Sequence, residues 1–534
     1  MMTVLHDEVN VLVVGAGAAG AAFTWRLASL GVEVTCLEQG EWQRPESSLT
    51  ALKNWESKRI SERSPNPNIR RNPADYPILD DTSIIKPAIY NGVGGSTILW
   101  SAHTPRFRPS DFRVKSLDGV GADWPITYWD LAEYYEINDE IMGTSGLHGD
   151  PGNPPRAPRT TPPVPLGIAG SRIAKALNEL KWHWWPSDGN ILTQDRGSRR
   201  ACNGCGPCEM GCATGARASV DITYWPEALA LGAELRTGAT VRRVLSDAAG
   251  KATGVEWVDI TGQEHITHAN IVVMAGNGIG TPRILLNSAS KEHPRGIGNS
   301  SDQLGRNLML HPIPVVTGVF DEDVESWSGN DAFALLIQEF YENDDTRDFK
   351  RGYEMQVTRG QGPLVTALGG FSLDVPWGTD HHDVFEQYFG RVATVAVTCE
   401  DLPHPNNKVT IDSTVTDRFG IPAARMWYEL EENSKRMITH GVKSATDLLL
   451  KAGARETYAK PFAPAAGFHL MGTARMGNDP RESFVDQACR SHDVPNLLVI
   501  DGSVFASAAA VNPTPTLQAV ALRAADLLRE DALV

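Results

Sequence analysis

The chain has 534 residues and a formal net charge of −16, from 49 Lys and Arg against 65 Asp and Glu. This acidic balance argues against nucleic acid as a partner, and no apolar run approaches the ~18 residues of a membrane span. With 41% hydrophobic residues the chain can bury sizeable cores, in about three domains or in two intertwined ones. The N-terminus lacks the basic region and apolar core of a signal peptide, so we expect a cytoplasmic protein, with export attached to a partner subunit as the alternative.

A glycine motif near the N-terminus predicts a dinucleotide site. Residues 11–14 read as a buried, β-branched strand that runs straight into G-x-G-x-x-G at Gly15, Gly17 and Gly20. Gly15 permits the tight turn, and Gly17 lets a pyrophosphate approach the backbone. Gly20 lets the following helix pack closely on the strand.

The elements after this motif complete a βαβ unit. A helix is predicted over residues 18–30 and a second strand over 33–37, which ends in Glu38. Glu38 follows Gly20 by 18 residues, where a ribose diol would donate hydrogen bonds to its carboxylate. The alternative is a Gly-rich turn with an incidental Glu.

Helix periodicity, strand alternation and chain breakers predict the remaining elements. In chain order they are irregular cover over 42–80, an amphipathic helix over 128–142, a connector with seven prolines over 151–165, strands within 239–258, a buried strand over 271–275, a helix near 281–288, strands over 391–398 and 424–430, a strand over 496–500, and a last helix over 515–529.

Four of the seven cysteines lie within eleven residues, as C-x2-C-x2-C-x3-C at Cys202, Cys205, Cys208 and Cys212. This is the spacing of bacterial ferredoxins, although Ala213 replaces the Pro that usually follows. Without an export signal, a metal or cluster is favoured over disulfides. Zinc, which four thiolates also suit, and a metal-free loop of reduced or paired cysteines remain alternatives.

A histidine and an asparagine stand out near the C-terminus. His469 lies in a Gly-flanked loop, and Asn512 follows it by 43 residues in the run Asn-Pro-Thr-Pro-Thr. Histidine can take a proton near neutral pH, and Asn512 offers a neutral donor and acceptor on a backbone restricted by Pro513. Taken alone, such a histidine is more often structural than catalytic.

Taken together, these blocks resemble the glucose–methanol–choline (GMC) oxidoreductase family from end to end. The resemblance implies FAD, an α/β Rossmann-like fold with a discontinuous FAD-binding domain, and an α+β substrate domain built on an antiparallel sheet. It also implies oxidation of an alcohol to a carbonyl. The matching blocks are the N-terminal motif, 93–97 with Trp100, 276–286, 305–308 with 311–312, the loop of His469, and 512–514.

On this match we expect the FAD domain to comprise 1–165, 196–311 and 465–534, with the Cys-rich segment 200–215 inside it. The substrate domain is expected over 312–464, where no nucleotide motif occurs.

The family match also assigns roles. His469 aligns with the catalytic histidine, and Asn512 occupies the place of its His/Asn partner. Oxidising C–OH needs a base for the hydroxyl proton and an oriented C–H, while the flavin takes the hydride. Val241 lies where the family contacts the adenine, or is simply a core valine. The expected cofactor residues are Gly15, Gly17, Gly20, Glu38, Gly94, Gly95, Ser96, Trp100, Val241, Asp501, Gly502, Asn512, Pro513 and Thr514.

Local similarity narrows the substrate and the cofactor linkage. Residues 94–107 are similar to the flavin-binding segment of pyranose oxidases, which carry a flavin-linking His where this chain has Leu99, so we expect non-covalent FAD. The leading substrates are sugars, glycosides or polyols with a primary or secondary alcohol. Oxidation of a non-sugar alcohol and a non-redox FAD-containing lyase on the same fold are the alternatives. Residues 377–383 form either a substrate loop, with Trp377 stacked on a sugar, or a surface loop.

Bacterial sugar dehydrogenases of the family are also similar, and they carry a comparable Cys segment that binds a 3Fe–4S cluster. Cys202, Cys208 and Cys212 match its ligand spacing, and Cys205 is extra. A cluster there would pass electrons to an external redox partner, whereas an oxidase would use O2.

Overall fold

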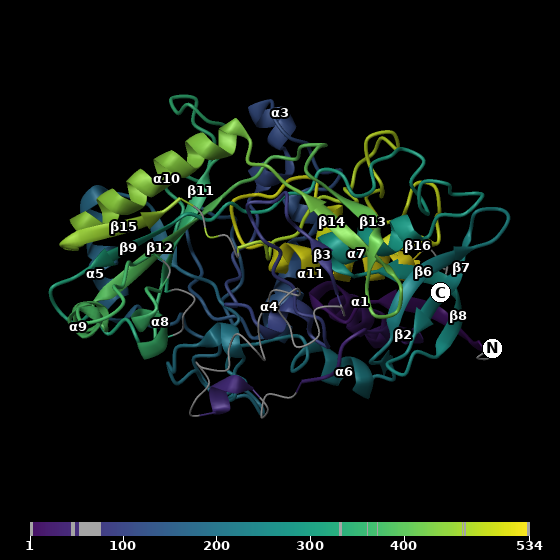
Figure 1. The fold of residues 1–534 in the computed structure, drawn as a ribbon, viewed down its shortest axis with the longest axis horizontal. Coiled ribbons are helices and arrows are strands. Elements are labelled where there is room, and N and C mark those ends of the chain that lie inside the picture. The colour runs from purple at the N-terminus through teal and green to yellow at the C-terminus, as the bar shows by residue number, and fades with distance from the viewer. Residues whose placement is uncertain are drawn as a thin grey trace.

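The structure is a computed structural model, and it describes residues 4–43, 48–52, 76–329, 334–359, 361–370, 372–461, 463 and 466–530. Most of the irregular cover predicted over 42–80 lies outside the described residues. Two large sheets lie toward opposite ends of the long axis of the molecule (Figure 1).

The first sheet has seven strands in the order β5-β2-β1-β8-β7-β6, with β16 also paired to β8. The pairs among β5, β2, β1, β8 and β16 are parallel, whereas β7 pairs antiparallel with both β8 and β6. Its strands are β1 (Leu5–Val14), β2 (Val34–Leu37), β5 (Glu234–Arg236), β6 (Thr240–Ser246), β7 (Ala252–Val258), β8 (Glu264–Met274) and β16 (Leu497–Val499).

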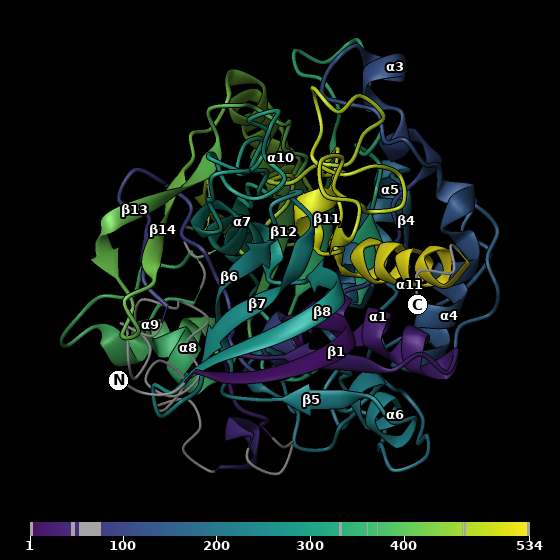
Figure 2. The ribbon, with the colours of Figure 1, turned by 90° about the vertical axis from the view of Figure 1, so that its right-hand side faces the viewer.

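Five helices accompany this sheet, and Figure 2 shows α1 and α11 beside β1 and β8. They are α1 (Ala18–Ser29), α4 (Ala132–Met142), α6 (Tyr224–Ala230), α7 (Asn277–Asn287) and α11 (Thr514–Glu530). The predicted helices are therefore confirmed, with one break. The helix expected over 128–142 begins as a 3₁₀ turn, Tyr128–Asp130, and becomes α-helical only after Leu131.

β1 and β8 are both longer than their apolar runs predict. β1 begins at Leu5 rather than near residue 11, and β8 begins at Glu264 rather than near 271. Their extra residues pair with each other, Leu5 opposite His265, but are only partly buried. Hydrophobicity marks the buried half of a strand, whereas the backbone ladder continues beyond the core.

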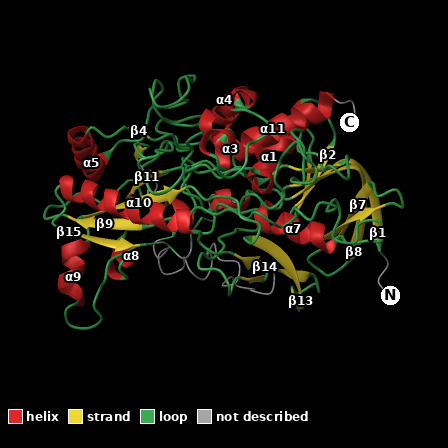
Figure 3. Ribbon diagram, turned by 90° about the horizontal axis from the view of Figure 1, so that it is seen from above, coloured by secondary structure: helices red, strands yellow, loops and turns green. Residues whose placement is uncertain are grey.

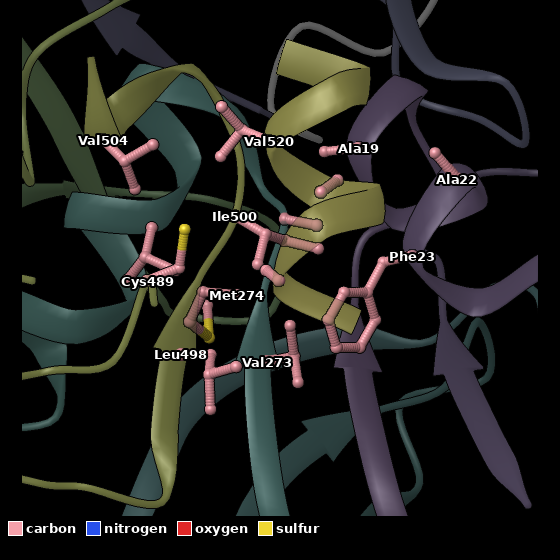
Figure 4. Close-up of a cluster of buried hydrophobic side chains, with 14 of the residues drawn as sticks. Ala19, Ala22, Phe23, Val273, Met274, Cys489, Leu498, Ile500, Val504 and Val520 are labelled. Carbon is pink, nitrogen blue, oxygen red and sulfur yellow. The ribbon is translucent and has the colours of Figure 1, made fainter. Parts of the chain in front are cut away.

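The core under the dinucleotide motif joins α1, α11, β8 and β16 (Figure 4). Phe23 of α1 and Val273 of β8 are fully buried there. The close approach requires Gly20, because a Cβ at that position would lie 1.9 Å from the carbonyl oxygen of Gly15. Gly20 therefore has the packing role that the motif predicts.

The second sheet is antiparallel throughout, in the order β15-β9-β12-β11-β10-β4. Its strands are β4 (Trp184–Pro186), β9 (Val315–Val319), β10 (Leu335–Ile337), β11 (Tyr353–Thr358), β12 (Val392–Cys399) and β15 (Glu456–Lys460). α10 (Glu432–Lys451) packs against β9 and β12, and α5 (Gly167–Leu180) packs against α10 (Figure 1). This is the antiparallel sheet expected of the substrate domain.

Two segments do not follow the expected domain ranges, although the ranges as a whole remain a prediction. α5 and β4 precede residue 312 but join the second sheet and its core. β13 (Lys408–Thr416) and β14 (Pro422–Trp427) lie within 312–464, yet they form a separate small sheet with β3 (Ile78–Leu79) and pack against α7 (Figure 3).

Short helices complete the described fold: α3 (Val114–Asp118), α8 (Pro363–Ala367) and α9 (His381–Tyr388). The Pro-rich stretch 151–165 contains neither a helix nor a named strand, as predicted. Within the described ranges, no helix combines the length and the apolar character that crossing a membrane requires.

Candidate active site

One cavity of about 650 Å³ runs between the two large sheets. It is lined at one end by the glycine loop after β1 with Glu38 and Val241, and at the other by His469 and side chains of β11 and β12. Its volume lies in the range of small-molecule and cofactor sites. All predicted cofactor residues line it except Gly20 and Gly94, which lie behind the lining.

Two glycine loops meet at the dinucleotide end. Gly95 has φ +52°, and a Cβ there would lie 2.8 Å from Cα of Gly17. Gly15 has φ +108°, and a Cβ there would lie 2.5 Å from the carbonyl oxygen of Ala275. Backbone amides can therefore come close to a bound pyrophosphate, as a dinucleotide requires.

Glu38 lies at the end of β2 and is buried. Its carboxylate accepts hydrogen bonds from the backbone N–H of Ala16 at 2.8 Å and of Gly40 at 2.9 Å, and it lines the cavity. These bonds hold the carboxylate beside the glycine loop, where it could accept from a ribose.

Asp501 ties the end of β16 to the start of α7. Its buried carboxylate accepts from Asn277 N at 3.0 Å, Thr281 Oγ1 at 2.5 Å and Ser503 N at 2.9 Å. Burial raises the pKa of Asp501, and the hydrogen bonds from Ser503 and Thr281 oppose that shift. Gly502 follows directly and also lines the cavity. The residues present at this end thus fit an FAD molecule.

At the other end, two buried histidines contact each other. The Nδ1 atoms of His311 and His469 are 2.8 Å apart, and Nε2 of His311 lies 3.0 Å from the carbonyl oxygen of Ala509 and 3.3 Å from that of Ala508. Nε2 of His469 lies 3.5 Å from Nδ2 of Asn512. The structure therefore brings the predicted pair His469 and Asn512 together and adds His311.

These contacts determine where the protons are. A carbonyl oxygen only accepts, so Nε2 of His311 carries hydrogen, and in a neutral ring its Nδ1 is an acceptor. Nδ1 of His469 must then donate, which leaves the lone pair of His469 on Nε2. That lone pair faces an amide donor of Asn512 within the cavity lining.

The environment keeps both rings neutral. Burial holds the pKa of His469 well below its ordinary value, and His311 and His103 lower it further. Burial also lowers the pKa of His311 to about 4, although its carbonyl contacts oppose the shift. A neutral His469 with a free Nε2 lone pair is the form that a general base needs.

A further polar cluster surrounds Asn512. Gln356 of β11 donates from Nε2 to Oδ1 of Asn512 at 2.8 Å. Glu354 of the same strand accepts from Gln356, and its Oε1 lies 4.0 Å from Nδ1 of His103. Burial lowers the pKa of His103 to about 3, although its side-chain interactions with Gln356 and Asn512 act in the opposite direction and raise it.

Sequence reasoning missed the roles of His311, Gln356, Glu354 and His103. His311 is 158 residues from His469, and no periodicity connects the two. Glu354 and Gln356 are two apart on a strand, a spacing that places both on one face, but no strand was predicted over 353–358.

The predicted sugar-stacking loop does not contribute to the cavity. Trp377 is 95% exposed, and none of residues 377–383 lines the site. The surface-loop alternative therefore holds for residues 377–380, whereas residues 381–383 form the first turn of α9.

The cysteine segment borders the cavity through Pro207, Glu209 and Met210. None of its four cysteines forms a disulfide. Burial raises the pKa of Cys202, whereas Arg217 and hydrogen bonds lower that of Cys212 against its burial. Among the described residues, no group of three or more His, Cys, Asp or Glu side chains is arranged to hold a metal ion.

Three family profiles match the chain. Two are described as GMC oxidoreductase and match residues 189–313 and 403–521. The third is described as an NAD(P)-binding Rossmann-like domain and matches residues 13–41, the βαβ unit of the glycine motif.

Characterised relatives are similar over nearly the whole length. The 2-methyl-1,2-propanediol dehydrogenase of Mycolicibacterium austroafricanum is 42% identical, over 99% of this chain and 96% of its own. The fructose dehydrogenase large subunit of Gluconobacter japonicus is 29% identical, over 98% of each chain. The crystal structure of pyridoxine 4-oxidase from Mesorbium loti has a TM-score of 0.66 at 16% identity, covering 98% of this chain and 99% of that one, so it shares the fold.

Proposed function

Because the chain belongs to the GMC oxidoreductase family, an enzyme family acting on CH–OH donors, we propose that it oxidises one hydroxyl of a small diol, polyol or sugar. His469 takes the hydroxyl proton, and FAD is held non-covalently. The observation that carries this proposal is the position of His469, whose Nδ1 contacts His311 and whose Nε2 lies 3.5 Å from Nδ2 of Asn512 in the cavity that the glycine loops share.

His469 and Asn512 have different roles in the proposed reaction, and each role follows from the position of the residue in the cavity. When bound, FAD supplies the acceptor for the hydride that leaves the carbinol carbon. His469 accepts the hydroxyl proton at Nε2 and becomes an imidazolium, whose Nδ1–H still donates to His311. Asn512 donates from Nδ2 toward the same place and can hold the substrate oxygen without adding charge.

The substrate class is supported by the relatives and by the second sheet. The two relatives are named for a 1,2-diol and for a sugar, both polyhydroxylated. Polar side chains of β11, β12 and the loop after β11 line the far end of the cavity and suit hydroxyl groups: Gln356, Thr358, Gln361, Thr394 and Thr398.

Non-covalent binding follows from Leu99, which lines the cavity and has no group that could bond the flavin. Acid precipitation of the purified protein should release all of its flavin into the supernatant. Flavin retained in the pellet would contradict this part of the proposal.

The main test is anaerobic bleaching of the yellow holoprotein by a panel of 1,2-diols, polyols and sugars. At least one alcohol should bleach the flavin, and air or a dye should restore it, which also distinguishes an oxidase from a dehydrogenase. His469→Ala should keep FAD but lose bleaching. If no alcohol bleaches the wild-type protein while FAD is present, the proposal of alcohol oxidation is refuted and the non-redox lyase becomes the favoured function.

An iron–sulfur cluster at Cys202, Cys208 and Cys212, with Cys205 as a further ligand, is a separate proposal that rests on their spacing alone. Anaerobically purified protein should then contain iron and labile sulfide in stoichiometric amounts. Zinc alone, or no metal, would refute it.

A further inference from the structure

The side-chain amide of Asn512 is hydrogen-bonded to Gln356 on the side away from His469. Its Oδ1 accepts from Nε2 of Gln356 at 2.8 Å, while its Nδ2 faces Nε2 of His469 at 3.5 Å. Gln356 is 7% exposed, so water does not compete freely for this bond. The contact joins the second sheet, through β11, to the loop before α11.

Gln356 is itself oriented by acceptors. Its Nε2 also donates to Oε1 of Glu354 and lies 3.2 Å from Oγ1 of Thr398 on the neighbouring strand β12. In this orientation the two hydrogens of the Gln356 NH₂ group are used by Oε1 of Glu354 and Oδ1 of Asn512. Glu354 is fully buried, and its burial raises its pKa to about 8.

We propose that Gln356, oriented by Glu354, is a positioning residue that determines which end of the Asn512 amide faces His469. If Asn512 were turned over, its NH₂ group would meet the NH₂ group of Gln356, and its oxygen would face Nε2 of His469. With two buried donors facing each other, neither N–H group has an acceptor, so Gln356 enforces the observed orientation. This inference rests on the proposed function, because it concerns the base of that reaction.

Gln356→Glu inverts the arrangement. A carboxylate at position 356 accepts, so the Asn512 amide should turn its NH₂ toward it and present Oδ1 to His469. An acceptor beside Nε2 stabilises the imidazolium, so the pKa of His469 should rise. His311 and His103 also act on that pKa. His103 itself interacts with Gln356 and Asn512, so its titration is followed in the same spectra.

The first measurement is a histidine titration by NMR on ¹⁵N-His holoprotein, assigned with His469→Ala. We expect Nε2 of His469 to stay unprotonated at pH 7 in the wild type and to titrate at higher pH in Gln356→Glu. Gln361→Glu is the matched control. It places the same charge in the same cavity, but its amide donates to Thr394 rather than to Asn512, so the shift of His469 should be smaller. Equal shifts in both variants would overturn the inference.

The second measurement is a double-mutant cycle on the rate of flavin reduction. Gln356→Met removes the hydrogen bond to Asn512 without adding charge. In the otherwise wild-type enzyme it should slow flavin reduction. In the Asn512→Ala background it should cause almost no further slowing, because Gln356 acts through Asn512. Additive effects would mean that Gln356 contacts the substrate or acts elsewhere, and would overturn the proposal.

The two failures are distinguishable. If no alcohol reduces the wild-type flavin, the proposed function fails, while the NMR titration still tests the orientation of Asn512. If alcohols reduce it and Gln356→Glu leaves the His469 titration unchanged, only the positioning role fails. FAD content and melting temperature confirm that each variant is folded.

Discussion

The histidine pair makes the sharpest prediction about catalysis, through His311→Leu. His311 is fully buried and does not itself line the cavity, so we expect it to act on the reaction through its contact with Nδ1 of His469, which does line it. Leucine fills a similar volume but accepts no hydrogen bond. The Nδ1–H of His469 then loses its acceptor both in the resting enzyme and when the ring is protonated.

Only the difference between these two states changes the rate. A buried hydrogen bond from a neutral donor contributes about 0.5–1.5 kcal/mol, and one from a charged donor about 1.5–3 kcal/mol. The transition state should therefore lose about 1–1.5 kcal/mol more than the ground state, which corresponds to about 5- to 13-fold slower flavin reduction. His311→Asn, whose Oδ1 falls near the position of Nδ1, should recover most of this loss.

The assay is anaerobic stopped-flow reduction of the FAD-loaded variants at pH 7.5 with an alcohol that bleaches the wild type. A His311→Leu rate within twofold of wild type, with FAD retained, would refute the role assigned to the His311–His469 contact. Equal losses in His311→Leu and His311→Asn would point to a packing effect instead of a lost acceptor.

Three further predictions follow from the site. Because the pKa of His469 is lowered, its neutral form persists as the pH falls. The rate of flavin reduction should therefore be constant from alkaline pH down to pH 6.5 and decline only in more acidic buffers. A decline that begins at or above pH 6.5 would contradict this prediction. Gly95→Ala should crowd Cα of Gly17 and weaken FAD binding by about 1–3 kcal/mol, whereas Gly119→Ala, also at positive φ but with nothing within 4 Å, should keep full flavin content. Glu354 is protonated in the fold up to about pH 8 but ionised above about pH 4.3 in the unfolded chain, so the wild type loses stability as pH rises between these values by about 1.4 kcal/mol per unit. Glu354→Gln lacks that loss of stability. In urea unfolding, the free energy of unfolding of the variant should therefore rise relative to that of the wild type between pH 5 and pH 8. The same difference at both pH values would contradict the raised pKa.

The dinucleotide half of the site could be predicted because its signals are local. Gly15, Gly17 and Gly20 are fixed by steric demands within one strand, turn and helix, and Glu38 follows at the end of the next strand. The structure places Gly15, Gly17 and Glu38 in the cavity lining and gives Gly20 the packing contact expected of it.

The proton-handling half could be predicted only in part. His469 and Asn512 were identified through the family resemblance, and the fold brings them within 3.5 Å of each other. Their orientation depends on His311 and Gln356, which come from other parts of the chain and leave no periodic trace. The sequence left Trp377 open between a substrate loop and a surface loop, because an aromatic beside polar residues is equally typical of an exposed turn, and the exposure of Trp377 decides for the surface.

The sequence alone thus predicted the fold class, and it proposed the cofactor residues and His469 as the base, since each rests on short-range patterns or on family motifs. Only the tertiary structure decided which nitrogen of His469 bears the lone pair and which end of Asn512 faces it. Those choices depend on hydrogen bonds between residues up to 198 positions apart, in a buried site where every donor must meet an acceptor.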